Sequence, residues 1–241
     1  MKYLSLFILL SFLACSKKTS SPDIVTGLVV NIPFDGSAVE SVSGTNGTIA
    51  KATFADDHHG VSGKAMYFNA ADSAVVDFGA LPLASFDSTN QFTISCWVKV
   101  ADTTSSMAIL SKRGYTGPFE YSLDSHFDHN GFTLDNWVSS GQTSIYGTDP
   151  LKAYAAIQPG VWEHIAYVAD GNTLNVYVNG SLQAGSDMHN NNLSFVATSA
   201  HLVIGTGGGY GRNYYFNGCI DDIKIYNRAL PLAAIQELAN L

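Results

Sequence analysis

Acidic, imidazole and indole side chains that could bind a sugar are concentrated around one glycine-containing turn. Asn130-Gly131 is typical of a two-residue hairpin turn. The register that this turn predicts pairs Asp124 with Trp137 and His126 with Asp135, all on one face of the hairpin. An exposed indole offers a flat apolar platform to a pyranose ring, and neighbouring carboxylates accept hydrogen bonds from the sugar hydroxyl groups. The segment therefore predicts a carbohydrate-binding patch.

Two other interpretations of this face stay open at the level of sequence. The same carboxylates and imidazole could hold a metal ion or act as acid and base. The face could also be the solvated side of an antiparallel sheet, which is normally polar. Trp137 is the residue that favours a ligand.

Two tyrosines from elsewhere in the chain complete the predicted patch. Tyr210 lies in a glycine-rich loop that could line a ligand groove or connect two strands with its tyrosines packed on the sheet. The loop does not resemble a phosphate cradle, because no helix start follows it. Tyr177 belongs to a second hairpin with a predicted three-residue turn at 170–172, and it falls on the polar face together with Tyr167. That hairpin pairs Val168 with Leu174, Ala166 with Val176, and His164 with Val178.

Charge and composition exclude several classes of partner. The chain of 241 residues carries 20 acidic and 12 basic side chains, a formal charge of −8, and only 13% of its residues are charged. An acidic chain with no basic cluster is a poor match to nucleic-acid phosphates. Sixteen of the acidic residues are Asp and four are Glu. Because Asp favours turns and metal loops, this imbalance indicates β structure with few candidates for a Glu-based hydrolase.

The N-terminal residues are typical of an export signal. Residues 1–14 hold a lysine and then an apolar run too short to span a bilayer comfortably, and Cys15 follows Ala14. This pattern is typical of a bacterial lipoprotein signal, in which Cys15 is lipidated and 15–26 form a flexible tether. An ordinary cleaved signal is the alternative. We expect a cell-envelope or outer-membrane location, reached only through the lipid anchor. The tether lacks the acidic run of Bacteroidetes-type surface lipoproteins, so the leaflet stays open.

The rest of the chain, 27–241, predicts one all-β domain. Short stretches alternate between apolar and polar residues and are bounded by Gly, Asn and Asp, as in antiparallel strands with one buried face. Many such strands without intervening helices make a sandwich or jelly roll. A short closing helix is predicted from Leu232, Ile235 and Leu238, which share one helical face. Cys96 and Cys219 could form a disulfide or be two buried thiols in different strands.

Five segments, in this order, resemble laminin-G-like, concanavalin A-like jelly-roll domains. They are FDGSAVESVSGTNGTI, GVSGKAMYFN, FTISCWVK, WEHIAYVADGNTLNVYVNG and YFNGCIDDIKIYNRALPLAAIQEL. The resemblance implies a two-sheet antiparallel jelly-roll β-sandwich from about Gly27 to Leu241. It fixes the fold better than the function, because the fold is shared by lectins, adhesion modules and glycosidases.

The resemblance also implies a structural Ca²⁺ ion. Asp35 and Asp221 match positions that often bind the ion in similar folds, and a carbonyl near Gly63 would be a further ligand. Oxygen ligands of this kind suit Ca²⁺. The alternative is that Asp35 caps a turn and Asp221 accepts backbone hydrogen bonds without a metal.

Catalysis finds little support in the sequence. Similar laminarinase-type enzymes carry two Glu on one strand, whereas the four Glu of this chain are separated by tens of residues. The nucleophile elbow G-x-S-x-G is also missing. We therefore expect a module that binds glycans without cleaving them. The alternatives are a hydrolase that uses Asp residues and an adhesion or structural module that binds envelope proteins.

Overall fold

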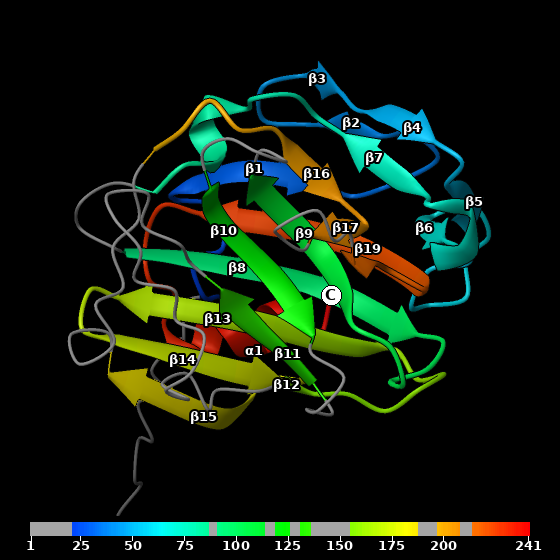
Figure 1. Ribbon diagram of the computed structural model, residues 1–241. Coiled ribbons are helices and arrows are strands. Elements are labelled where there is room, and N and C mark those ends of the chain that lie inside the picture. The colour runs from blue at the N-terminus through cyan, green and yellow to red at the C-terminus, as the bar shows by residue number, and fades with distance from the viewer. Residues whose placement is uncertain are drawn as a thin grey trace, which may run out of the picture.

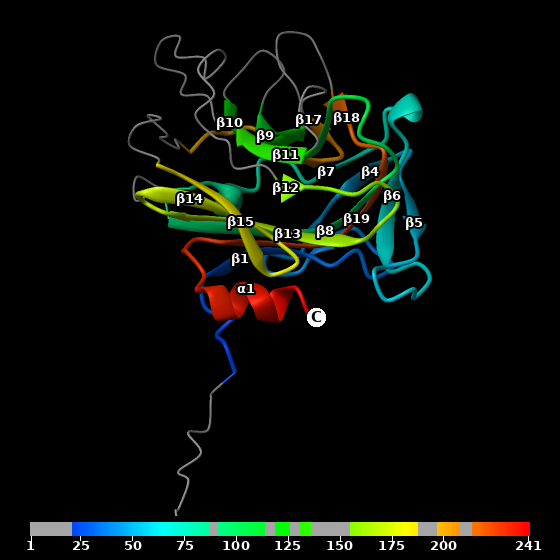
Figure 2. The same cartoon turned by 90° about the horizontal axis from the view of Figure 1, so that it is seen from below.

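The chain folds into two antiparallel sheets packed face to face, as the sequence predicts (Figure 1). The computed structural model describes residues 21–86, 91–113, 119–125, 131–135, 155–187, 197–207 and 214–241. Every pairing between its named strands is antiparallel. Seen edge on, the two sheets lie one above the other, and one short helix lies beneath the lower sheet (Figure 2).

The strands are named in spatial order. Sheet I contains β15 (Ser181–Asp187), β14 (Thr173–Val178), β13 (Glu163–Asp170), β8 (Gln91–Val100), β19 (Gly218–Tyr226), β6 (Ala65–Phe68) and β5 (Thr53–Ala55), and β1 (Leu28–Ile32) also pairs with β19. Sheet II contains β12 (Ala155–Ala156), β11 (Gly131–Asp135), β10 (Phe119–Ser125), β9 (Met107–Arg113), β16 (Leu202–Ile204), β7 (Val75–Asp77) and β4 (Thr48–Ala50). The short pairs are β2 (Val39–Glu40) with β3 (Thr45–Asn46), and β17 (Thr206–Gly207) with β18 (Tyr214–Tyr215). The helices are η1 (Ala70–Asp72), η2 (Pro82–Ala84) and α1 (Leu232–Leu238).

The core fills the space between the sheets. Along β8, Phe92, Ile94, Cys96 and Val98 all point into it, which confirms the alternation expected of a strand with one apolar face. Sheet II contributes matching apolar residues from β9, β10 and β16. Side chains at the intervening positions of β8 therefore lie on the outer face of sheet I.

The β13–β14 hairpin differs from the sequence prediction by one residue. Ala169 pairs with Leu174 and Ile165 with Val178, so the turn holds four residues, 170–173, and not three. Asp170 fixes this longer turn, because its Oδ1 accepts the N–H groups of Asn172 and Thr173 at 2.8 and 2.7 Å. A one-residue change exchanges the two faces of a strand. As a result Tyr167 is buried in the main core and does not lie on the polar face.

The outer face of sheet I is covered by α1, which explains why β13 is buried on both sides. Ala166 and Val168 form a second apolar cluster with Ala234, Ile235 and Leu238 of the helix. The predicted helical face is confirmed at Ile235 and Leu238, whereas Leu232 is exposed. Among the described residues, no helix is long and apolar enough to cross a membrane.

Candidate functional site

Asp124 lies on the floor of the outer face of sheet II. The residues on either side of it in β10 alternate, and Leu123 points into the core, so Asp124 and Ser122 face outward. Asp124 is nevertheless buried, and it accepts a hydrogen bond from the Ser122 hydroxyl. Strand β17 crosses this floor, where the Ser111 hydroxyl donates to the Thr206 carbonyl at 2.8 Å. The predicted sugar ligand is thus a packed acid beneath a short strand.

Glycine is required at the crossing point of β17. A Cβ at Gly207 would lie 2.5 Å from the Ala108 Cβ and 2.7 Å from the Ser122 Oγ, and closer still to the Asp124 carboxylate. Real Cβ atoms essentially never come within 3.0 Å of such neighbours. Asp124 therefore helps to seat the β17–β18 hairpin on sheet II.

The register of β10 with β11 differs from the predicted hairpin by four residues. Ser122 pairs with Asp135 and Asp124 with Thr133, where the sequence predicts His126 opposite Asp135. The physical reason is that Gly131 is a strand residue paired with Ala156 of β12, so it does not form a two-residue turn. The predicted pairings of Asp124 and His126 are therefore wrong.

The other predicted sugar ligands are not brought together within the described residues. His126, Trp137 and Tyr210 lie outside the part of the chain that the structure describes. Tyr177 packs against the α1 cluster on the outer face of sheet I. Burial and the nearby Asp170 charge raise the pKa of Tyr177. Because Asp124 faces outward from the other sheet, Tyr177 and Asp124 lie on opposite sides of the sandwich.

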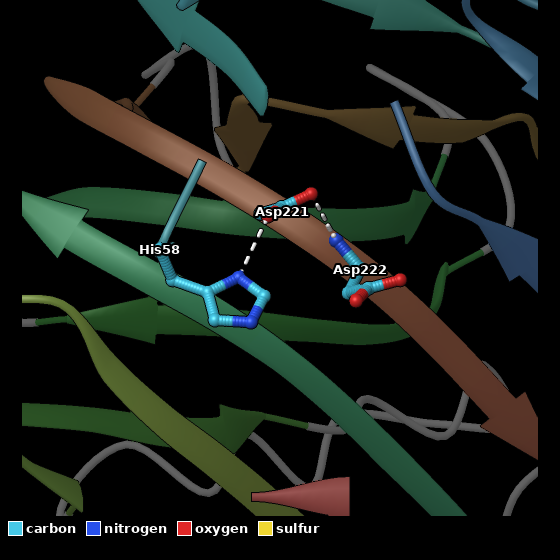
Figure 3. A group of neighbouring side chains, drawn as sticks. All are labelled: His58, Asp221 and Asp222. Atoms are coloured by element: carbon cyan, nitrogen blue, oxygen red, sulfur yellow. Dashed lines mark hydrogen bonds and ion pairs between the residues drawn. The ribbon is translucent and has the colours of Figure 1, made fainter. Parts of the chain in front are cut away.

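A second polar cluster lies on the outer face of sheet I and was not anticipated from the sequence (Figure 3). His58 Nδ1 lies 2.9 Å from Asp221 Oδ2, and both side chains are almost fully buried. The His58 ring stacks on Trp97, with ring centroids 4.3 Å apart and planes 9° from parallel. The half-buried Trp162 approaches His58 edge-on at 6.3 Å. Only the adjacent histidines at 58–59 and the doubled acid at 221–222 could have signalled this cluster.

Two local features position this cluster. The connection between β5 and β6 turns on Asp57, whose Oδ1 accepts the N–H groups of His59 and Val61 at 2.9 and 2.7 Å. His59 also contacts the backbone oxygen of Leu241, which ties this loop to the C-terminus. In β19, the register shifts after Asp221, and the next residue has a left-handed φ of 47°.

The second feature, this β-bulge, brings Asp221 and Asp222 together with His58. One ligand atom from each lies within 4.8 Å of the others. The Asp222 N–H donates to Asp221 Oδ1 at 2.8 Å, and Lys224 Nζ lies 2.7 Å from Asp222 Oδ1. Burial raises the pKa of Asp221 to about 6, although the hydrogen bond with His58 lowers it in part. The arrangement closes the loop and the chain end over sheet I.

A neighbouring Ser–His pair has no catalytic arrangement. His164 Nε2 lies 2.8 Å from Ser95 Oγ, and both residues are buried beneath the outer surface of sheet I. A catalytic triad needs a carboxylate on the other ring nitrogen, but His164 Nδ1 is buried without a hydrogen-bond partner. Burial, with the charges of Lys224 and His58 nearby, lowers the pKa of His164 to about 3. This imidazole is therefore a neutral structural group near pH 7.

The three residues expected to bind Ca²⁺ are only partly assembled. A Cβ at Gly36 would lie 3.9 Å from the Gly63 carbonyl oxygen, so the two loops that contain Asp35 and Gly63 are neighbours. The Asp35 carboxylate is exposed and pairs with Lys64 at 3.1 Å. Asp221 directs its carboxylate to His58. Asp35 and Gly63 supply the oxygens that Ca²⁺ prefers, whereas an ion at Asp221 would have to compete with an imidazole.

The cysteines do not pair. Cys96 points into the core, whereas Cys219 pairs across the sheet with Lys99, whose position in β8 alternates to the outer face. Both are free thiols. The prediction of two thiols in different strands is therefore confirmed, and the disulfide alternative is wrong. Burial raises the pKa of both thiols.

The four glutamates serve structural roles or lie far from Asp124. Glu40 accepts backbone N–H groups of Asn31, Val42 and Ser43 at 2.7–2.9 Å. Burial raises the pKa of Glu40, but hydrogen bonds from Ser43, Asn31 and Val42 outweigh this effect and lower it overall. Glu163 accepts the Gln158 N–H at 2.8 Å. Glu237 lies on α1, on the far side of the sandwich from Asp124.

Glu120 is the most enclosed of the four. It lies 3.4 Å from Lys112 Nζ, and both side chains are fully buried. It also accepts the Phe86 N–H at 3.0 Å, while Lys112 donates to the carbonyls of Ala80 and Ala200 at 2.9 and 3.0 Å. Burial lowers the pKa of Lys112, and the Glu120 charge partly offsets this effect. The pair fastens two loops to the end of sheet II.

An antiparallel two-sheet sandwich with polar clusters on both outer faces defines a jelly-roll domain of the lectin type. The chain belongs to the concanavalin A-like lectin/glucanases superfamily, whose Laminin_G_3 family model matches residues 69–236. No curated protein matches the chain.

Solved structures with this fold come from several kinds of protein. Domain 4 of a GH43 extracellular arabinanase from Geobacillus stearothermophilus, in complex with arabinotriose, is 22% identical with a TM-score of 0.64, and the match covers 88% of this chain and 98% of that one. The binding domain of Paraclostridial Mosquitocidal Protein 1 is 14% identical, with a TM-score of 0.59 and coverages of 89% and 52%. A Trypanosoma rangeli sialidase mutant displaying trans-sialidase activity is 16% identical, with a TM-score of 0.58 and coverages of 88% and 33%. At these identities the likeness shows the fold alone.

Proposed function

We propose that the chain is a non-catalytic carbohydrate-binding module of a cell-envelope lipoprotein. The observation that carries this proposal is the state of the four glutamates. Three of them are buried, and each accepts backbone N–H groups, while Glu237 lies on α1. Retaining glycoside hydrolysis needs two carboxyl groups about 5 Å apart and free to reach the sugar. Glutamates committed to holding backbone cannot act in this way.

The outer face of sheet II is the proposed binding surface. Its floor contains Asp124 and Ser122, and the β17–β18 hairpin lies on that floor through Gly207. The sequence adds Trp137 and Tyr210, which lie outside the described residues. Two observations about similar proteins favour a sugar ligand. The superfamily includes lectins, and the arabinanase domain of the same fold was solved with arabinotriose.

A glycan array with purified full chain tests this function. The array includes arabino-oligosaccharides and sialylated glycans, and Trp137→Ala is compared with wild type. We expect binding to at least one glycan class and its loss in the variant, because the indole supplies the stacking platform. Trp162→Ala is the matched control, since Trp162 belongs to the cluster on sheet I. If no glycan binds, the function is refuted; if Trp137→Ala binds normally, the assigned surface is wrong.

We also propose a structural Ca²⁺ ion held by Asp35, Asp221 and the Gly63 carbonyl. Support comes from the proximity of the Asp35 and Gly63 loops and from the weak partner of Asp35. The Asp35–Lys64 pair is exposed, so its replacement by an ion has a small cost. Such an ion would tie the loop after β1 to β19 and would have no part in binding sugar.

A further inference from the structure

The described chain begins on the α1 side of the sandwich. Ile24 packs against the α1 cluster, and its carbonyl accepts a hydrogen bond from the Tyr226 hydroxyl at 3.0 Å. Arg228 holds the carbonyls of Asp23 and Thr26 at 2.7 and 2.6 Å. In Figure 2 the chain enters on the same side as α1, opposite to sheet II. The point where the tether joins the domain is therefore fixed by contacts with sheet I.

The tether is too short to reach around the molecule. Seven residues, 16–22, separate Cys15 from Asp23. Fully extended, they span at most about 25 Å. Two packed sheets are about 10 Å apart, and a covering helix adds about 10 Å more, before side chains and loops are counted. A lipid on Cys15 would thus hold the α1 side near the bilayer and keep the outer face of sheet II away from it.

Apolar side chains are exposed around α1. Val25 follows Ile24, Leu182 pairs with Tyr177 beside the helix, and Leu232 and Leu241 come from the helix and the chain end. Isolated exposed apolar residues are common on protein surfaces. These four, however, surround the single place at which the tether leaves the domain. A lipid surface is the partner that such a tether brings to this face.

We propose that the α1 face, defined by Val25, Leu182, Leu232 and Leu241, rests on the surface of the lipid bilayer that holds Cys15. The outer face of sheet II then points away from the membrane, toward glycans in the surrounding medium. This orientation rests on the lipid anchor of the proposed function, and it does not depend on which glycan binds.

A fluorescent probe on either side of the domain tests the orientation. The full chain is produced with its own N-terminus in a bacterial host and reconstituted in phosphatidylcholine vesicles that contain a headgroup-nitroxide lipid. Gln236→Cys places the probe on the exposed side of α1, and His201→Cys places it on exposed sheet II sequence. Cys96 and Cys219 are buried, so the folded chain is labelled at the new thiol. We expect the probe at 236 to lose most of its fluorescence and the probe at 201 to lose little.

Equal quenching at both positions, or stronger quenching at 201, overturns the proposed orientation. Mass spectrometry of the same sample reads lipidation of Cys15 directly. A chain without lipid overturns the anchor and this inference, while glycan binding is unaffected, so the two failures are distinguishable. Cys15→Ser should leave both probes unquenched.

Two matched variants test the surface itself. Leu232 on α1 is 49% exposed, and Leu83 on η2, away from α1, is 50% exposed. Leu232→Gln should reduce quenching of the probe at 236, whereas Leu83→Gln should not. If the two substitutions have the same effect, the bilayer does not contact the α1 face. Concentration-dependent dimerisation in solution that removes the Leu232 effect would assign this face to a second copy, and would equally overturn the proposal.

Discussion

His58 Nδ1 and Asp221 Oδ2 lie 2.9 Å apart, although 163 positions separate the two residues in sequence. The pair joins the loop between β5 and β6 to the last strand of sheet I, and the stacked Trp97 ring lies directly beside it. Because burial excludes water from Asp221, loss of the imidazole would leave a carboxyl group with less hydrogen bonding than it needs. The contact is thus a long-range fastening of the domain.

His58→Ala should destabilise the fold by about 1–3 kcal/mol, the usual cost of leaving a buried polar partner unsatisfied. The chain offers a matched control in His201, whose Nδ1 lies 3.0 Å from Asp77 Oδ2. The side chains of that pair are 57% and 39% exposed, against 6% and 3% for His58 and Asp221. His201→Ala should cost less than about 1 kcal/mol. Urea unfolding of the three proteins measures the difference, and equal midpoints for the two variants would contradict the structural role of His58.

His164 should make the fold sensitive to acid. Its pKa is lowered from 6.5 to about 3 in the folded chain, so between these values the unfolded chain binds more protons. Stability should therefore fall as pH falls through this window, by up to about 1.4 kcal/mol per pH unit. Asp221 opposes the trend, since its raised pKa lets the folded state take up a proton first. His164→Gln should flatten the fall relative to wild type in thermal melts from pH 7 to about pH 4. The same slope in both proteins would show that His164 is not the cause.

Both core-domain thiols should stay reduced in air. Cys96 and Cys219 point to opposite faces of sheet I, so no rotation of the side chains alone can join them. Thiol titration of the Cys15→Ser chain should detect neither thiol when it is folded and both when it is unfolded without reductant. Dithiothreitol should leave the melting temperature unchanged. A peptide containing linked Cys96 and Cys219 in a mass spectrum would refute the arrangement.

Gly207→Ala should displace the β17–β18 hairpin from sheet II, because its Cβ would meet Ala108, Ser122 and Asp124 at once. We expect loss of glycan binding with a stability cost of about 1–3 kcal/mol, as for other overpacked sites. Gly79→Ala serves as the control: a Cβ there meets nothing within 4 Å, although its φ of 70° adds backbone strain. Calorimetric titration measures binding. Normal affinity in Gly207→Ala would remove the hairpin from the binding surface.

Added Ca²⁺ should raise the melting temperature of chelator-treated chain. An ion that binds only the folded state stabilises it by about 2.7 kcal/mol at a hundredfold excess over its dissociation constant. Asp35→Asn should abolish the shift, whereas Asp72→Asn, on η1, should keep it. Unchanged melting of wild type with Ca²⁺ and with chelator would contradict the proposed ion.

The sequence predicts the strands well because apolar alternation is a local property. It predicts strand register poorly, because register depends on turn length. Asp170 lengthens one turn by binding two later N–H groups, and Gly131 is taken into β11 by pairing with β12. The His58–Asp221 contact could not be read from either segment. It requires the β19 bulge and the loop turned by Asp57, which only the assembled sheet brings together.

The central claim, binding without cleavage, is tested most directly on one sample. The full chain is titrated calorimetrically with the glycan that binds best on the array, and the same mixture is then assayed for new reducing ends after prolonged incubation. The account predicts saturable binding with no new reducing ends. Release of reducing ends that scales with the amount of chain would contradict it.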